Sequence, residues 1–261
     1  MQTFEPNAVL VGRCDYAPGL ASFFVRPNDG RVVSFERGQF TTLALPRSGA
    51  EGAASVVRHA YSFASSPDAD AYEFLIREVP GGSLTPQLFA LDIGDPLWVE
   101  EAAHGNFTLR RAESALVLVF VATGTGIAPF RSMLSDQSLH ERFARVVLIY
   151  GARSVQDLAY GEEFEARARG DQRFKCVMTV SREPETGAML ADNTVRGRVL
   201  DVLCTERYER VVGIELRPEN SQVFLCGNPA MIDDAIVRLE VRGFRKHRNR
   251  SPGNVHTEKY W

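Results

Sequence analysis

The stretch SALVLVFVATGTGIAPFRS, residues 114–132, joins an apolar run to a glycine-containing turn and a helix start. An unbroken apolar run of this kind is typical of a strand buried on both faces of a parallel sheet. Gly124 and Gly126 let the backbone turn sharply, and Pro129 suits the first turn of a helix. The stretch therefore predicts a strand, a tight turn and a helix, the repeating unit of α/β sheets.

The chain beyond this stretch repeats the same alternation. Further apolar runs are RVVLIYGA (145–152), FKCVMTV (174–180) and QVFLCG (222–227). Helical stretches are APFRSMLSDQ (128–137), GEEFEARAR (161–169) and PAMIDDAIVRLEV (229–241). Alternation of strands and helices implies right-handed crossovers, so we predict a doubly wound parallel sheet in an α/β domain over residues 113–261. Residues 184–222 show no readable pattern and are left unassigned.

The first 112 residues have a different rhythm, with short strands separated by Gly, Pro, Asp and Asn. The candidates are NAVLVGRCDY (7–16), LASFFVRP (20–27), QFTTLAL (39–45), VVRHAYSFAS (56–65), AYEFLIREV (71–79) and DPLWVEEA (95–102). Closely spaced strands with turn signals predict a small antiparallel β-barrel domain over residues 1–112. One helix is expected after Thr85 as N-cap, with Pro86 at its first position. The predicted fold is a two-domain α+β chain.

Composition excludes several classes of protein. The net charge of −3 argues against a dedicated nucleic-acid binder. No apolar run approaches about 18 residues, and the N-terminus lacks the pattern of a secretory signal, so we expect no membrane insertion. The four cysteines are scattered without a C-x-x-C pair, which gives no support to a metal site and favours a cytoplasmic location. We expect a monomer.

Two turns have the composition of phosphate-binding segments. In ATGTGIAPFRS (122–132) glycines precede a helix, whose free N–H groups suit a pyrophosphate, although the spacing is not G-x-G-x-x-G. In VPGGSLTPQL (79–88) two glycines are joined by Ser83 and Thr85, again before a helix. On spacing alone the first turn could equally be an ordinary turn before a helix, and the second is better explained as a capped helix in a surface loop. One such turn in each half favours two bound nucleotides.

Two further segments carry polar or reactive side chains. RHAYSFASS (58–66) places hydrogen-bonding groups on both faces of a strand, as though a flat polar ligand lay against it. In LCGNPAMID (225–233), Cys226 comes at the carboxyl end of a strand, where open α/β sheets bind ligands. A lone cysteine is more commonly a small buried apolar residue, so this alternative stays open for Cys226.

Seven motifs in order resemble the ferredoxin/flavodoxin–NADP⁺ reductase family, in its bacterial type with an aromatic C-terminus. They are RHAYSFASS, GGSLTP, ATGTGIAPFRS, YGAR, VSRE, LCGNPAMI and the terminal EKYW. The resemblance implies that the barrel binds FAD and the α/β domain binds NADP(H). It also implies an oxidoreductase that passes a hydride from nicotinamide C4 to flavin N5 and delivers electrons to ferredoxin or flavodoxin.

The resemblance assigns FAD contacts to the barrel. The tyrosine of the strand motif lies against the flavin in this family and the serine faces N5, while the family's arginine is replaced here by His59. Strand alternation places His59 on the side of Tyr61 and Arg58 on the other side, so we expect His59 to face the phosphate. The implied FAD residues are His59, Ala60, Tyr61, Ser62, Phe74, Leu75, Ile76, Ser83, Leu84 and Thr85.

The resemblance also assigns the NADP(H) site and the C-terminus. Thr125 would lie between the two rings, and Arg153, Arg182 and Arg198 would bind the 2′-phosphate. Tyr260 would lie near the flavin and Trp261 on the adenine. The implied catalytic residues are Ser62, Cys226 and Glu258, of which Glu258 would help Ser62 pass a proton toward N5.

The basic run RGFRKHRNR (242–250) stands out in a chain of net negative charge. It could be a solvated surface segment, or it could speed the approach of an acidic ferredoxin or flavodoxin.

Three other functions remain open from the sequence. The chain could be an NADH-dependent oxygenase reductase of the same superfamily, or a general flavin or quinone reductase. It could also be a non-enzymatic flavin- or nucleotide-binding sensor or adaptor.

Overall fold

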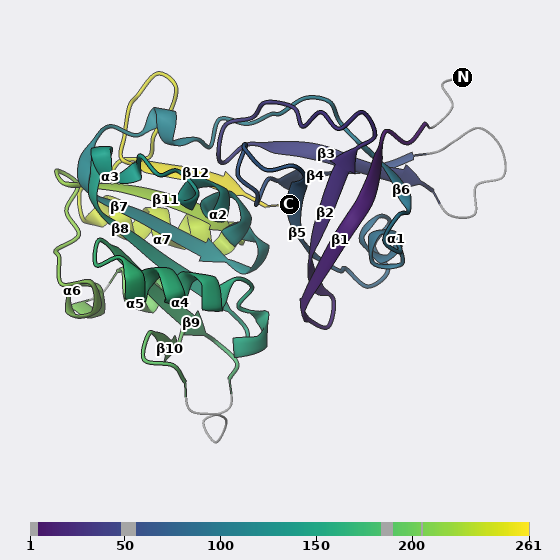
Figure 1. Ribbon diagram of the computed structural model, residues 1–261. Coiled ribbons are helices and arrows are strands. Elements are labelled where there is room, and N and C mark those ends of the chain that lie inside the picture. Colours follow the sequence, from purple (N-terminus) through teal and green to yellow (C-terminus); the bar gives the residue numbers. More distant parts are fainter. Residues whose placement is uncertain (1–4, 48–55, 184–189, 205, 261) are drawn as a thin grey trace. The chain divides into compact units, whose positions relative to one another are not determined.

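The computed structural model describes residues 5–47, 56–183, 190–204 and 206–260 (Figure 1). The chain divides into two compact units, one of residues 1–109 with 128–136 and one of residues 110–127 with 137–261. Helix α2 (Ala128–Leu134) therefore belongs to the first unit, although the chain on either side of it belongs to the second. The boundary between residues 112 and 113 stays a prediction.

The first unit contains a six-stranded sheet of order β4-β3-β6-β1-β2-β5, in which every pairing is antiparallel. This confirms the antiparallel N-terminal sheet predicted from sequence. Its elements are β1 (Ala8–Ala17), β2 (Leu20–Pro27), β3 (Phe40–Pro46), β4 (Val56–Ser62), β5 (Tyr72–Arg77), α1 (Thr85–Phe89) and β6 (Pro96–Val99).

The core of this sheet follows from strand alternation. Phe23 of β2 and Phe74 of β5 point to the same side and join Phe63 in one buried apolar cluster. Strand β4 ends at Ser62, three residues before its predicted end. Phe63 lies beyond the end of the strand and its ring packs in the core, so residues 63–65 are not the continuation of β4 that the sequence predicted.

The predicted cap of helix α1 is wrong by one residue. The N-cap is Leu84, and it makes no side-chain capping bond. Thr85 is the first helical residue, and its Oγ1 accepts a hydrogen bond from the Val79 N–H at 2.9 Å. The threonine hydroxyl therefore closes the glycine turn before the helix instead of capping the helix.

The second unit contains a six-stranded parallel sheet of order β10-β9-β8-β7-β11-β12. This confirms the predicted parallel α/β sheet. Its strands are β7 (Ala115–Thr123), β8 (Phe143–Ala152), β9 (Phe174–Val180), β10 (Thr194–Arg196), β11 (Ser221–Gly227) and β12 (Val255–Lys259). Its helices and 3₁₀ turns are η1 (Leu109–Arg111), η2 (Gly124–Ile127), α3 (Leu139–Arg142), η3 (Val155–Asp157), α4 (Gly161–Gly170), α5 (Val199–Leu203), α6 (Glu206–Val212) and α7 (Pro229–Val241).

Helices cover both faces of the parallel sheet, as a doubly wound fold requires. On one face, alternate residues of β7, β8 and β11 pack with buried residues of α5, α6 and α7. On the other face Tyr150 of β8 packs edge-on against Phe164 of α4, with ring centroids 6.5 Å apart.

The strand order reverses at β7. From β7 the chain adds β8, β9 and β10 on one side, and it then returns to add β11 and β12 on the other side. In open α/β sheets, ligands bind outside the carboxyl ends of the strands where the order reverses. This rule points to the ends of β7 and β11, at Thr123 and Gly227.

The unassigned stretch from residue 184 to 222 contains β10, α5 and α6 among its described residues. Each of these elements has seven residues or fewer, which is too short to show a clear period. Across the part of the chain that the structure describes, no helix is both long enough and apolar enough to cross a membrane.

Candidate functional site

The end of β4 carries the first group of candidate residues. His59 and Ala60 are exposed, Tyr61 is half-buried, and Ser62 is buried. The Tyr61 ring lies 6.4 Å from the Phe74 ring, between the barrel core and the surface. Burial raises the pKa of Tyr61, so its hydroxyl stays protonated at neutral pH. An exposed polar strand ending beside an aromatic ring can accept a flat ligand.

The glycine turn Gly81–Thr85 lies beside this strand. Nε2 of His59 is 3.5 Å from Oγ of Ser83. Gly81 has a φ of 73°, and a Cβ on Gly82 would lie 2.8 Å from the Val79 carbonyl oxygen. The structure thus places His59 beside the glycine turn Gly81–Thr85, as the prediction of a shared phosphate contact requires.

Arg58, the neighbour of His59, takes the other face of the strand. Its guanidinium lies over the Trp98 ring, 5.0 Å from the centroid. This agrees with the alternation argument that separated Arg58 from His59.

The three candidate residues of β5 divide between two faces. Phe74 and Ile76 lie in the barrel core, whereas Leu75 is buried but is not part of that core cluster. The side chains of Phe74 and Ile76 therefore line one face of β5, together with Phe23 of β2, and the side chain of Leu75 lies on the other face.

The second group of candidate residues lies at the carboxyl ends of β7 and β11, where two turns pack against each other. A Cβ on Gly126 would lie 2.6 Å from the Cys226 carbonyl oxygen. A Cβ on Gly227 would lie 2.3 Å from Oγ1 of Thr123, and Gly227 has a φ of 126°. The Thr123 hydroxyl accepts a hydrogen bond from the Asn228 N–H at 3.0 Å. Both turns therefore require glycine. At the ends of β7 and β11, these two positions carry main-chain atoms without a side chain.

Cys226 lies next to two C-terminal candidate residues, Glu258 and Tyr260. It is fully buried, and Glu258 is its register partner on the neighbouring strand β12. Burial raises the pKa of the Cys226 thiol well above its usual value; the nearby Glu258 raises it too, and a hydrogen bond with Tyr260 opposes this shift. The thiol is therefore protonated and suits packing or hydrogen bonding better than nucleophilic attack. Trp261, also a candidate, lies outside the described residues.

The candidate arginines lie at the same edge of the sheet. Arg153 directly follows β8, Arg182 follows β9, and Arg198 follows β10; all three side chains are exposed. The N–H of Arg182 donates to the carbonyl of Arg153 at 2.8 Å, so these two residues are neighbours.

Arg196 is a further candidate that the sequence reasoning did not select. It is the last residue of β10, it is exposed, and it pairs in register with Val180 at the end of β9. The segment VRGRV offers two arginines, and only the second was chosen. The short strand β10, which the sequence did not reveal, is what brings Arg196 to the edge beside β9.

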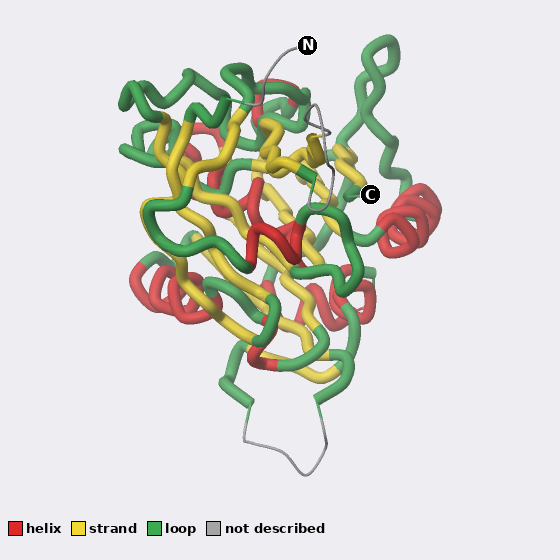
Figure 2. Tube along the Cα trace, turned by 90° about the vertical axis from the view of Figure 1, so that its right-hand side faces the viewer, coloured by secondary structure: helices red, strands yellow, loops and turns green. Residues whose placement is uncertain are grey.

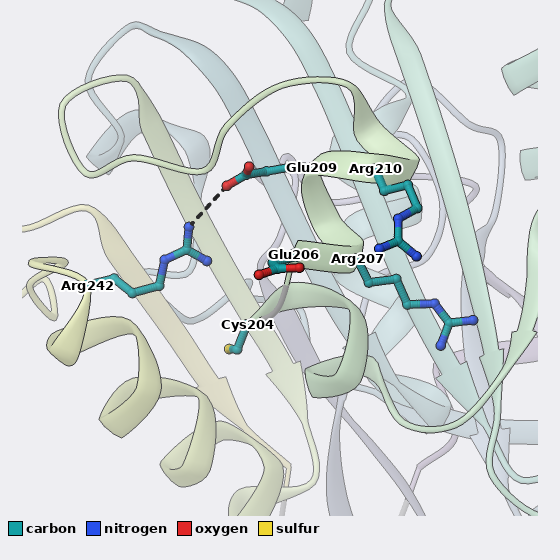
Figure 3. Close-up of a pocket in the computed structure, with 6 residues that line it drawn as sticks. All are labelled: Cys204, Glu206, Arg207, Glu209, Arg210 and Arg242. Carbon is teal, nitrogen blue, oxygen red and sulfur yellow. Dashed lines mark ion pairs between the residues drawn. The ribbon is translucent and has the colours of Figure 1, made fainter.

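A separate cavity of about 610 Å³ opens on the second unit (Figure 3). Its lining consists of Cys204, Glu206, Arg207, Glu209, Arg210 and Arg242. Arg242 forms an ion pair with Glu209 at 3.9 Å, and burial raises the pKa of the Cys204 thiol. The cavity contains none of the candidate site residues, and its mixed charges favour no ligand class.

Known proteins resemble both units. Residues 120–236 match the family model described as "Oxidoreductase NAD-binding domain". A flavodoxin/ferredoxin–NADP reductase of Escherichia coli (strain K12) is 37% identical over 234 residues, which cover 88% of this chain and 89% of that protein. Ferredoxin–NADP reductase B of Sorangium cellulosum is 34% identical over 262 residues, covering 98% of both.

A solved structure extends the likeness to three dimensions. The crystal structure of a ferredoxin NADP⁺ reductase from Neisseria gonorrhoeae with bound FAD and NADP matches with a TM-score of 0.86 and 25% identity. The match covers 98% of this chain and all of that one. With relatives above 30% identity over most of its length, the chain belongs to the ferredoxin/flavodoxin–NADP reductase family.

Proposed function

We propose that this chain is an FAD-dependent reductase that moves electrons between NADPH and a one-electron carrier, ferredoxin or flavodoxin. The observation that carries the proposal is the 37% identity to a flavodoxin/ferredoxin–NADP reductase over 88% of the chain, which includes both sheets. When bound, FAD accepts a hydride from NADPH and releases electrons one at a time.

The first unit would hold FAD. Tyr61 would lie against the flavin, and Ser62 would face its N5 edge. His59 and Ser83 would contact the phosphates from adjacent positions, supported by the 3.5 Å approach of their side chains. A histidine offers fewer donors than the arginine of the family, so the phosphates would depend more on the Gly81–Thr85 turn.

The second unit would hold NADP(H). The close packing of Gly126 on Cys226 brings the turns after β7 and β11 together, and the nicotinamide would lie at these strand ends. Arg153, Arg182 and Arg198, with Arg196 added, form an exposed positive edge that would select the 2′-phosphate. Cys226 would help to orient the nicotinamide, and Glu258 would supply a proton path.

The carrier protein would meet the basic segment 242–250. Residues 244–254 form a loop that folds back on itself through reciprocal backbone bonds between Arg248 and Ser251, at 2.9 and 3.0 Å (Figure 2). Arg245, Arg248 and Arg250 are exposed on it. Positive charge held on a defined loop would steer an acidic carrier. A cytoplasmic, monomeric protein is the form we propose, in keeping with the free thiols at Cys14, Cys176, Cys204 and Cys226.

Anaerobic titration of the purified protein with NADPH tests this function. The expected result is a yellow protein whose flavin absorbance bleaches with NADPH faster than with NADH and returns on addition of oxidised ferredoxin or flavodoxin. Equal rates with both nucleotides would favour an oxygenase reductase. Activity toward free flavins or quinones alone would favour a general reductase, and flavin that NADPH cannot reduce would favour a sensor.

A further inference from the structure

A buried polar network lies on the side of the first sheet that faces away from the barrel core. Tyr72, Phe74 and Ile76 of β5 are in the core cluster, so the intervening Glu73 points to the opposite face. Its exposed fraction is only 4%. A carboxylate at this depth requires charged or hydrogen-bonding partners, because burial removes its hydration.

Helix α2 supplies the main partner. Nη1 of Arg131 donates to Oε2 of Glu73 at 2.5 Å, while the Ser22 hydroxyl donates to Oε1 at 2.7 Å. The same Nη1 also donates to the carbonyl oxygen of Ala64 at 3.0 Å. One nitrogen atom of α2 thus joins a β5 carboxylate to the main chain that follows β4.

The next residue of α2 makes a parallel contact. Oγ of Ser132 donates to the carbonyl oxygen of Ser65 at 2.7 Å. From the other side, the Ala64 N–H donates to the Glu73 carbonyl at 2.8 Å, and the Glu73 N–H donates to Oγ of Ser65 at 3.2 Å. The Ala64–Ser65 segment is therefore fixed between β5 and α2.

This network suits positioning better than stability. A buried ion pair stabilises a fold no better than apolar packing of the same volume, but it fixes the direction of each bond. Because β4 ends at Ser62, its ladder with β3 no longer sets the course of the chain at Ala64, and the bonds to Glu73 and α2 do so instead. The two carbonyls held by α2 come two and three residues after Ser62, the residue proposed to face flavin N5.

We propose that Glu73, Arg131 and Ser132 are positioning residues that hold Tyr61 and Ser62 in register with the flavin, acting through Ala64 and Ser65. The inference rests on the proposed function, since it takes FAD to bind at the end of β4.

The first test compares two serines of the same helical segment. Ser135 donates to the Ser132 carbonyl at 2.7 Å and accepts from Arg37 at 2.9 Å, but no bond described for it reaches residues 64–65. Ser132→Ala loses one hydroxyl bond and Ser135→Ala loses two, so the control variant should lower Tm at least as much. Only Ser132→Ala should raise the Kd for FAD, by about 3- to 10-fold, and change the visible circular dichroism of the flavin.

The second test uses the charge of residue 131. Because a single nitrogen of Arg131 makes both bonds, the ammonium of Arg131→Lys can keep them, whereas Arg131→Gln loses the charge. The rate of flavin reduction at saturating NADPH should fall in the order wild type, Lys, Gln, with an unchanged KM for NADPH. Adding Glu73→Gln to Arg131→Gln removes the lone buried charge and should recover Tm without recovering that rate.

The outcomes separate the inference from the function on which it rests. If Ser132→Ala and Arg131→Gln match the wild type in Kd for FAD and in reduction rate, the positioning role is refuted. It is refuted equally if the double variant recovers the rate together with Tm. Wild-type protein that binds no FAD, or whose flavin NADPH does not reduce, refutes the proposed function itself.

Discussion

The two glycine turns that precede helices, Gly81–Thr85 in the first unit and Gly124–Ile127 in the second, differ in where their contacts come from. In the first turn the close contacts are local, because Gly82 packs against the Val79 carbonyl and the Thr85 hydroxyl accepts from the Val79 N–H. In the second turn, Gly126 touches the backbone of β11, so its shape depends on main-chain packing.

This difference shows that similar glycine-containing motifs can depend on different forces. A turn held by contacts within itself is sensitive to loss of its own polar groups. A turn held against the backbone of a distant strand tolerates no added atom at the contact, since that backbone cannot move aside as a flexible side chain can. The following predictions test this contrast, from the largest expected effect to the smallest.

The largest effect is expected from Gly126→Ala. Its methyl group would lie 2.6 Å from the Cys226 carbonyl oxygen, so the turn must shift. A displacement of about 1 Å can cost about 100-fold in rate, and we expect kcat/KM for NADPH to fall by about that factor while FAD stays bound. Steady-state kinetics and flavin content measure the two effects.

Gly124→Ala is the matched control. Gly124 has a φ of 55°, but a Cβ there would meet nothing within 4 Å. Only backbone strain of about 1–2 kcal/mol is then expected. If the two alanine variants lose the same activity, steric packing at Gly126 is not what shapes the turn.

The next effect is expected from Tyr61→Ala in the first unit, where side chains carry the site. The half-buried ring offers an aromatic surface beside Phe74, and its loss should remove about 2 kcal/mol of FAD binding, or about 30-fold in Kd. Fluorescence titration of the apoprotein with FAD gives this constant. Flavin retention equal to that of the wild type would contradict the stacking role.

A smaller effect, confined to one nucleotide, is expected from Arg182→Ala. This exposed arginine follows β9 beside Arg153, and a charge-assisted contact is worth about 1.5 kcal/mol at the low end. The KM for NADPH should rise about 10-fold and that for NADH should stay constant. Parallel increases for both nucleotides would remove Arg182 from the 2′-phosphate site.

Apart from these functional effects, the structure predicts a dependence of stability on pH. His256 is buried between the rings of Phe224 and His247, and burial is the main cause that lowers its pKa from 6.5 to about 3. The folded state therefore favours the neutral imidazole, so its contribution is complete above pH 6.5 and is lost as pH falls toward 3. The loss approaches about 1.4 kcal/mol per pH unit in that range.

Denaturant unfolding between pH 7 and pH 4 measures this dependence. His256→Phe keeps an aromatic ring in the stack but removes the titration, along with the 3.0 Å contact to Gln222. Its free energy of unfolding should fall less steeply with acidification than that of the wild type. Identical slopes would show that His256 does not titrate on unfolding.

The sequence predicted the sheets well because their signals are local. Four apolar runs were sufficient for β7, β8, β9 and β11, and turn residues marked the strands of the first unit. It did not reveal β12, whose residues VHTEK look polar and whose place in the sheet comes from pairing with β11. Likewise, nothing local connects Glu73 with Arg131, which lie 58 residues apart.

The candidate site residues also divide into those with a local sequence signal and those whose position depends on contacts between distant segments. Those on strand ends, such as Cys226 and Arg182, could be placed from strand periodicity together with family motifs. Arg196 was missed because its position depends on the three-residue strand β10. The cap at Thr85 was misjudged because the hydroxyl had a competing partner in the Val79 N–H, which the helix pattern does not reveal.

The membership of residues 128–136 in the first unit has a consequence for recombination between relatives. A chimera joined at residue 112 would combine Glu73 from one parent with the helix that neutralises it from another. A crossover at the domain boundary predicted from the sequence therefore separates a charge from its counterion. A stable hybrid must inherit residues 128–136 from the same parent as residues 1–109.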